Sequence, residues 1–169
     1  MPCKGGYRDR IEASRAQRVK DQEYRESPVY RHWRWLVEEV YRASNGFDNL
    51  SSDNQAYFAV AILSHDVYRG GFQSYFGNSA SNHYPRALSA LMELSATNAL
   101  RLTVAAKETL FGPEALPLSL VARRSVVAAA SAQAEAKLTQ IDNLFWKDPD
   151  ALEERLDKFA AAKGLRARF

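Results

Sequence analysis

The sequence is short of cysteine and has no long apolar run. Cys3 is the single cysteine among 169 residues, so an internal disulfide is excluded, and no Cys/His cluster has the spacing of a zinc site. No segment approaches the roughly 18 apolar residues that span a bilayer, and the first residues lack the apolar stretch of a secretory signal. We therefore expect a cytoplasmic protein without a metal and without a membrane partner.

Strand patterns and catalytic motifs are missing as well. No stretch alternates apolar and polar residues over a convincing length. The sequence contains no P-loop, no G-x-S-x-G, no H-E-x-x-H and no EF-hand loop. We therefore expect no cofactor and no enzymatic activity. The net charge is only +3 and its signs are interleaved, whereas nucleic-acid binding needs clustered positive charge facing phosphates.

Apolar residues recur at helical spacing along most of the chain, which predicts an all-α, single-domain bundle of about seven to eight helices. Residues 1–26 are charged and poor in apolar residues, so we expect a basic, exposed helical arm. Residues 27–169 would form the helical domain, which opens with Ser27-Pro28, a pair typical of a helix start. The aromatic residues exceed what one small core must bury, which is consistent with a homodimer.

The same spacing predicts where individual polar side chains lie. His32 is expected to face water, and His65 is expected on the buried side of its helix. A near-continuous helical pattern runs from Leu118 to Phe145, with Arg123-Arg124 on the exposed face of the predicted helix.

The densest group of signals begins at Gly70-Gly71, where glycine's access to positive φ predicts a break in a helix. Phe72, Tyr75 and Phe76 follow at i, i+3 and i+4, on one face of a short helix. This stretch is a structural centre, a binding site, or both; the candidate residues are Gly70, Gly71, Phe72, Gln73, Tyr75, Phe76, Asn78 and Ser79. A structural role is favoured for the amides of Gln73 and Asn78, which can bind backbone groups freed by the helix breaks.

Two further groups have a chemical interpretation. His65, Asp66 and His83 offer a base and a carboxylate, so a hydrolase-like site is a less favoured alternative. Four acids are spaced i, i+3, i+4 and i+7, and are expected to share one face of the last helix: Asp150, Glu153, Glu154 and Asp157. A row of carboxylates can imitate phosphates toward a basic partner, but acids near a helix N-terminus also stabilise its dipole.

The segment Gly70–Ser79, G-G-F-Q-S-Y-F-G-N-S, resembles the N-G-G-F-x-Q-Y-F-x-N-S signature of the bacterial DNA mimic protein nineteen family. The resemblance covers residues 50–162 and includes Pro85-Arg86-Ala87-Leu88 and the segment Ile141–Glu153. It implies an all-helical domain without cofactor or known catalysis, which presents acidic surface to a DNA-binding protein. The sequence pI of about 9.0 differs from that of a strongly acidic mimic.

Together these features favour a non-enzymatic module that binds another protein, with a DNA-binding protein as the partner that the resemblance implies. The alternative is contact with nucleic acid through the basic ends, Lys4–Arg25 and Lys163–Arg168.

Overall fold

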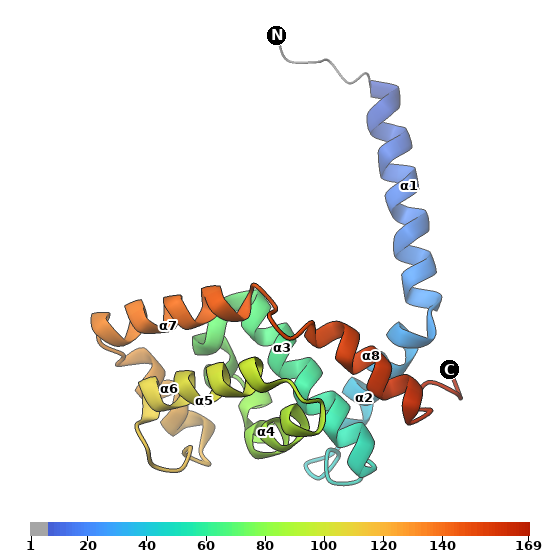
Figure 1. Ribbon diagram of the computed structural model, residues 1–169. Helices are drawn as coiled ribbons and strands as arrows, with labels where there is room; N and C mark the ends of the chain where they lie inside the picture. The colour runs from blue at the N-terminus through green and yellow to red at the C-terminus, as the bar shows by residue number, and fades with distance from the viewer. Residues whose placement is uncertain (1–6) are drawn as a thin grey trace.

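The computed structural model describes residues 7–169, which contain eight α-helices, one 3-10 helix and no strand (Figure 1). The elements are α1 (Tyr7–Glu26), α2 (Pro28–Arg42), α3 (Ser52–Gly77), η1 (Ser79–His83), α4 (Tyr84–Glu93), α5 (Thr97–Phe111), α6 (Leu120–Ala128), α7 (Ala132–Phe145) and α8 (Leu152–Ala162). The prediction of an all-α bundle of seven to eight helices is confirmed. No helix among these residues is both long and apolar enough to cross a membrane.

Helix α3 is the centre of the body, and α4, α6, α7 and α8 all pack against it (Figure 1). Its N-terminus is capped by Ser51, whose hydroxyl accepts a hydrogen bond from the Asn54 N–H at 3.3 Å. Five consecutive residues near its start, 56–60, are buried. Because consecutive positions of a helix point in different directions, burial of all five means that neighbours surround this part of α3.

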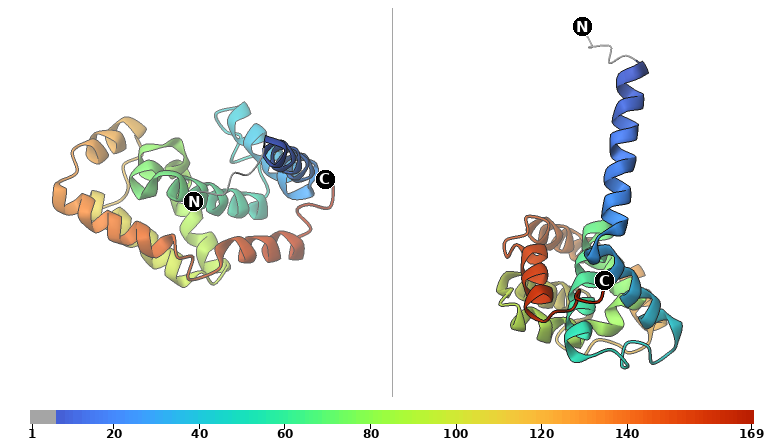
Figure 2. Two further views of the ribbon diagram at one scale, coloured as in Figure 1. Left: turned by 90° about the horizontal axis from the view of Figure 1, so that it is seen from above. Right: turned by 90° about the vertical axis from the view of Figure 1, so that its right-hand side faces the viewer.

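Helix α1 projects away from the body as an arm (Figures 1 and 2). It meets α2 at the Ser27 cap, where the rings of Tyr24 and Tyr30 pack edge to face at 5.4 Å. The side chains of Arg10 and of residues 12–26 are all exposed. Residues 1–6 of the expected arm, Lys4 included, lie outside the described residues.

His32 is buried, so the prediction that it faces water is wrong. Its Nε2 lies 2.9 Å from Asn54 Oδ1, and its ring packs between Tyr57 and Phe169 at 4.9 and 5.5 Å. Burial lowers the pKa of His32. The error arises from tertiary structure that helical spacing does not reveal. The end of the chain folds back over α2 and covers the face on which His32 lies.

The predicted continuous helix from Leu118 to Phe145 is two helices, because α6 ends at Ala128 and Ser131 caps α7 by accepting the Ala134 N–H. Arg123 was expected to be exposed and is buried. Its guanidinium donates to the carbonyls of Pro117 and Leu118, at 2.8 and 2.9 Å, and to the Asn82 side chain. A charge can be buried here because backbone carbonyls of the link before α6 accept hydrogen bonds from it.

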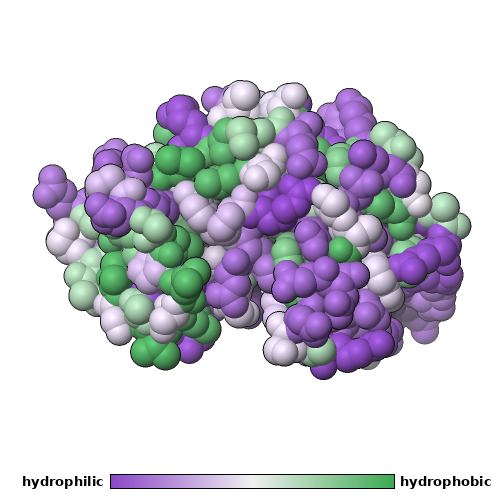
Figure 3. All heavy atoms as spheres, turned by 90° about the horizontal axis from the view of Figure 1, so that it is seen from below, coloured by the Kyte–Doolittle hydropathy of each residue, from purple (hydrophilic) through white to green (hydrophobic). Residues whose placement is uncertain are grey.

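Apolar side chains gather on the side of the body that α6 and the preceding link form, whereas the α2 side of the same face is mostly polar (Figure 3). Leu118 in this link is 97% exposed and Val121 in α6 is 73% exposed.

Candidate protein-binding groove

The glycine pair kinks α3, as predicted. Gly71 has φ 71° and ψ −177°, a conformation that side-chain-bearing residues rarely adopt. A Cβ at Gly71 would lie 2.3 Å from Asp142 Oδ2. The position therefore requires glycine for two reasons, its backbone conformation and the close approach of α7.

Two residues from the end of α7 satisfy backbone groups at this kink. The Phe72 N–H donates to Asp142 Oδ1 at 2.9 Å, and the indole Nε1–H of Trp146 donates to the Val67 carbonyl at 2.9 Å. An unbroken helix would pair these groups with Tyr68 and Gly71. Burial raises the pKa of Asp142, and the Phe72 N–H opposes that shift. At the glycine kink, the capping role expected of Gln73 and Asn78 thus belongs to Asp142 and Trp146.

The aromatic residues of the signature belong to the core. Phe72, Tyr75 and Phe76 are fully buried, and Phe72 packs edge to face on Phe145 at 5.3 Å. Phe76 does the same with Phe111 at 5.4 Å. These rings are therefore closed to a partner in the folded protein. The other candidates of the signature lie around the kink and the end of α3: Gly70 and Asn78 are exposed, Gln73 and Ser79 are half-buried, and Gly71 is buried.

The side chain of Asn78 links the end of α3 to its middle. Its Nδ2 donates to Asp66 Oδ2 at 3.1 Å and lies 3.4 Å from Ser74 Oγ. Asp66 is buried, and its other carboxylate oxygen lies 3.4 Å from His65 Nδ1. Asn78 therefore holds a buried carboxylate in place.

Of the three residues of the hydrolase alternative, His65 and Asp66 lie 3.4 Å apart, whereas His83 packs against other side chains. The prediction that His65 is buried is wrong: its side chain is 55% exposed. His83 instead stacks on Phe47 at 3.9 Å and packs edge to face on Phe58. Burial lowers the pKa of His83 to about 4. Among the described residues, no three His, Cys, Asp or Glu side chains are grouped as metal ligands would be.

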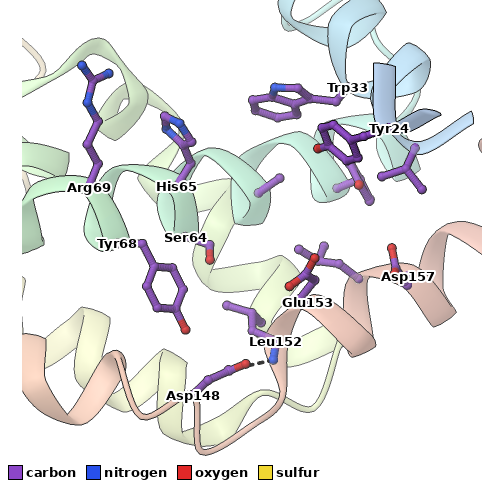
Figure 4. Close-up of a pocket in the computed structure, with 14 residues that line it drawn as sticks. Tyr24, Trp33, Ser64, His65, Tyr68, Arg69, Asp148, Leu152, Glu153 and Asp157 are labelled. Carbon is purple, nitrogen blue, oxygen red and sulfur yellow. Dashed lines mark hydrogen bonds between the residues drawn. The ribbon is translucent and has the colours of Figure 1, made fainter. Parts of the chain in front are cut away.

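A groove of about 600 Å³ separates α3 from α8 and reaches the junction of α1 and α2 (Figure 4). Aromatic and aliphatic side chains line much of it: Tyr24, Val29, Trp33, Tyr57, Ala61, Tyr68, Leu152 and Leu156. Its polar lining comprises Ser64, His65, Arg69, Asp148, Glu153 and Asp157. We call this site the α3–α8 groove.

Carboxylates make the α8 side of the groove negative. Figure 4 shows Tyr68 extending from α3 toward the α7–α8 link, where Asp148 lies, and Glu153 extending from α8 toward α3. Burial raises the pKa of Tyr68, and the negative charges of Asp148 and Glu153 add to that effect. Asp148 accepts the Leu152 N–H at 2.8 Å, but within the described chain neither it nor Glu153 forms an ion pair. The site can therefore attract a cation that lies beside aromatic rings.

The four acids expected on one face of α8 are separated in the structure. Asp150 precedes the helix, is buried, and caps α5 by accepting the Ala99 N–H at 2.7 Å. Glu154 pairs with Lys158 at 2.6 Å outside the groove. Asp157 lines the groove but pairs with Arg166 at 2.6 Å, so Glu153 is the acid of the four that lies in the groove without an ion pair in the described part of the chain.

The basic C-terminal segment is engaged with the body. Lys163 pairs with Asp53 at 3.1 Å, and Arg166 donates to the Tyr57 hydroxyl at 3.0 Å as well as to Asp157. The guanidinium of Arg168 lies over the Trp35 ring at 3.8 Å. These contacts leave the segment less available to phosphates than a free basic tail.

The sequence pattern does not predict the α3–α8 groove. Trp33 lies in α2, whereas Tyr68 and Arg69 lie in α3, and helical spacing does not specify how these helices pack against each other. Glu153 is a candidate from the sequence because of its place in a row of acids on one helix face, and not because of its neighbours in the groove.

Comparison with known proteins gives a family. The DMP19-like protein family matches the chain over residues 48–163. No curated protein and no solved structure matches it. The matched region includes the kink, its Asp142 and Trp146 partners, and both main walls of the groove.

Proposed function

The chain belongs to the DMP19-like protein family, and from this we propose that it is a non-enzymatic protein-binding module whose docking site is the α3–α8 groove. The observation that supports the proposal is the combination, in one groove, of an aromatic lining with carboxylates that have no cationic partner in the described part of the chain. Such a site suits a basic segment of another protein.

The chemistry of the groove favours arginine and lysine side chains. Their aliphatic stems can pack on Trp33 and Tyr68 while their charged ends approach Glu153 and Asp148. A guanidinium over a tryptophan or tyrosine ring gains about 0.5–1 kcal/mol at an exposed site. The described part of the molecule already makes this contact twice, between Arg168 and Trp35 and between Arg166 and Tyr57.

The class of partner that we propose is a DNA-binding protein in the cytoplasm, as the family's namesake activity implies. Such proteins carry exposed basic segments that contact phosphates. The net charge of the whole chain, +3, does not oppose this docking, because exposed charges farther away than about 8–10 Å are screened at physiological salt. The acidic contact is local, so the partner's basic segment must be short.

Charge reversal at neighbouring residues of α8 provides the test. Glu153→Lys places a cation in the groove, whereas Glu154→Lys makes the same change of charge on the same helix outside it. We expect wild type and Glu154→Lys to capture the same basic protein from a native lysate. Glu153→Lys should bind that purified protein at least about tenfold more weakly.

A second measurement examines the class of partner. A duplex that contains the captured protein's own DNA site should displace it from the immobilised wild type. Equal binding by the two variants would remove the groove from the proposal, and a captured protein without DNA-binding activity would refute the proposed class.

A further inference from the structure

The arm formed by α1 has a charge distribution that the groove does not explain. Residues 10–20 contain four basic residues and one acidic residue, Glu12, whereas residues 21–26 contain three acidic residues and one basic residue, Arg25. The part of the arm far from the body is therefore positive, and the part next to the body is negative. All of these side chains are exposed, and no ion pair joins them among the described residues of the arm.

Few contacts with the rest of the protein stabilise this helix. It is polar on nearly every side, and Val19 and Tyr24 are its large exposed apolar residues in the described part. A helix that is polar all round needs stabilising side-chain pairs or a partner. Two side-chain hydrogen bonds run along it, from Gln17 to Asp21 at 2.8 Å and from Gln22 to Glu26 at 3.0 Å. The arm is about 30 Å long, long enough to pack against another helix. Most of it projects free of the body (Figures 1 and 2).

We infer that the arms of two copies pair side by side and antiparallel. In this arrangement the positive outer part of each arm lies against the negative inner part of the other, so both contacts are attractive. The pairing is isologous and closes as a two-fold dimer, since the same surface is used twice. A parallel arrangement would place like charges together.

One face of the arm suits this contact. Arg15, Val19, Gln22 and Glu26 are spaced i, i+4, i+7 and i+11, which keeps them on one side of a helix. Antiparallel pairing brings Arg15 of one arm toward Glu26 of the other, with Val19 and Gln22 between these ends. The arm projects from the body (Figure 2). In an antiparallel pair of arms the two bodies would therefore lie at opposite ends and would not obstruct the contact.

The arm lies outside residues 48–163, where the family matches, so the inferred contact is a property of this chain's own N-terminal segment. The inner end of the arm reaches the α3–α8 groove through Tyr24, but the residues changed in the test below, Arg15, Arg18, Glu23 and Glu26, do not line the groove. The dimer should weaken with salt, because exposed ion pairs are screened: we expect its dissociation constant to rise at least about tenfold between about 50 mM and about 500 mM NaCl.

Charge exchange between the two parts of the arm tests the inference. The outer variant is Arg15→Glu with Arg18→Glu, and the inner variant is Glu23→Lys with Glu26→Lys. Each variant alone places like charges together and should be monomeric by sedimentation equilibrium in low salt. An equimolar mixture should form a heterodimer, and one chain with all four substitutions should again form a homodimer, because both contacts become complementary.

The control is Arg101→Glu with Lys137→Glu, which makes the same change in net charge as the outer variant on exposed positions of the body. This protein should dimerise as wild type does. Far-UV circular dichroism and urea unfolding check that every variant keeps the folded body. A wild type that is monomeric in low salt, or an outer or inner variant that dimerises as wild type does, would overturn the inference.

Discussion

Replacement of Gly71 by alanine should destabilise the protein far more than the loss of a typical glycine. The residue has φ 71°, and the added Cβ would lie 2.3 Å from Asp142 Oδ2. With ψ −177°, this is a backbone region that essentially only glycine adopts, and holding a residue with a Cβ there costs about 1–3 kcal/mol. Displacing the Asp142 carboxylate also removes the cap on the Phe72 N–H, which is worth about 0.5–2 kcal/mol. We therefore expect Gly71→Ala to lower the free energy of unfolding by about 2–4 kcal/mol.

Urea unfolding followed by far-UV circular dichroism measures this loss. Gly77→Ala is the matched control, because a Cβ at Gly77 meets no atom within 4 Å and its φ is not positive. The control should leave the free energy of unfolding unchanged or raise it by up to about 1 kcal/mol, since alanine fits this backbone conformation and restricts the unfolded chain. A Gly71→Ala protein as stable as the Gly77→Ala protein would refute both the strain and the clash.

A double-mutant cycle separates the two contributions. Asp142→Ala alone leaves the Phe72 N–H without its acceptor and should cost about 0.5–2 kcal/mol, the value of the cap given above. In the double variant the clash with the carboxylate is absent and its cap is lost only once, so the combined loss should fall short of the sum by about 1 kcal/mol or more. Additive losses would show that Gly71 and Asp142 act independently.

Three other contacts yield predictions. Arg123→Ala should lower the free energy of unfolding by about 2–4 kcal/mol, since carbonyls of the link before α6 lose their donor, whereas Arg124→Ala on the exposed side should cost under about 1 kcal/mol in the same urea assay. Asp150→Ala should cost about 1–2 kcal/mol through loss of the α5 cap, and a loss no larger than that of Glu154→Ala would contradict the capping role. The pKa of His83 is lowered to about 4, so the folded protein binds a proton at this residue less readily than the unfolded chain does. The free energy of unfolding should therefore be highest above about pH 6.5. It should fall by about 3 kcal/mol as the pH drops toward 4, because the unfolded chain then binds a proton that the folded protein does not. Urea midpoints across this range should vary less in His83→Phe, and an unchanged pH dependence would refute the assignment.

The sequence predicts most of the fold because local signals agree with the packing. Ser27 and Pro28 begin a helix, Gly70-Gly71 interrupts one, and the rings that follow are buried. In each case a short stretch contains the physical cause: a capping hydroxyl, a residue without Cβ, or apolar groups at helical spacing.

The errors occur where a distant segment decides the outcome. His32 is buried because the last residues of the chain cover α2, and Arg123 is buried because carbonyls of the link before α6 accept hydrogen bonds from its guanidinium. Asp150 does not lie beside the other three acids, because its carboxylate accepts a hydrogen bond from the Ala99 N–H in the first turn of α5. Helical spacing gives the direction of a side chain relative to its own helix, but not which neighbour lies in that direction.

The glycine kink also has a consequence for the order in which the protein is made. Asp142 and Trp146 reach α3 from 70 and 79 residues further along the chain. While the ribosome is still adding those residues, the segment after Gly71 has neither its cap nor the wall of α7 against Phe72. We therefore expect the last turns of the central helix to reach their final form only when nearly the whole polypeptide has emerged, and until then the rings that the finished protein buries are exposed to solvent.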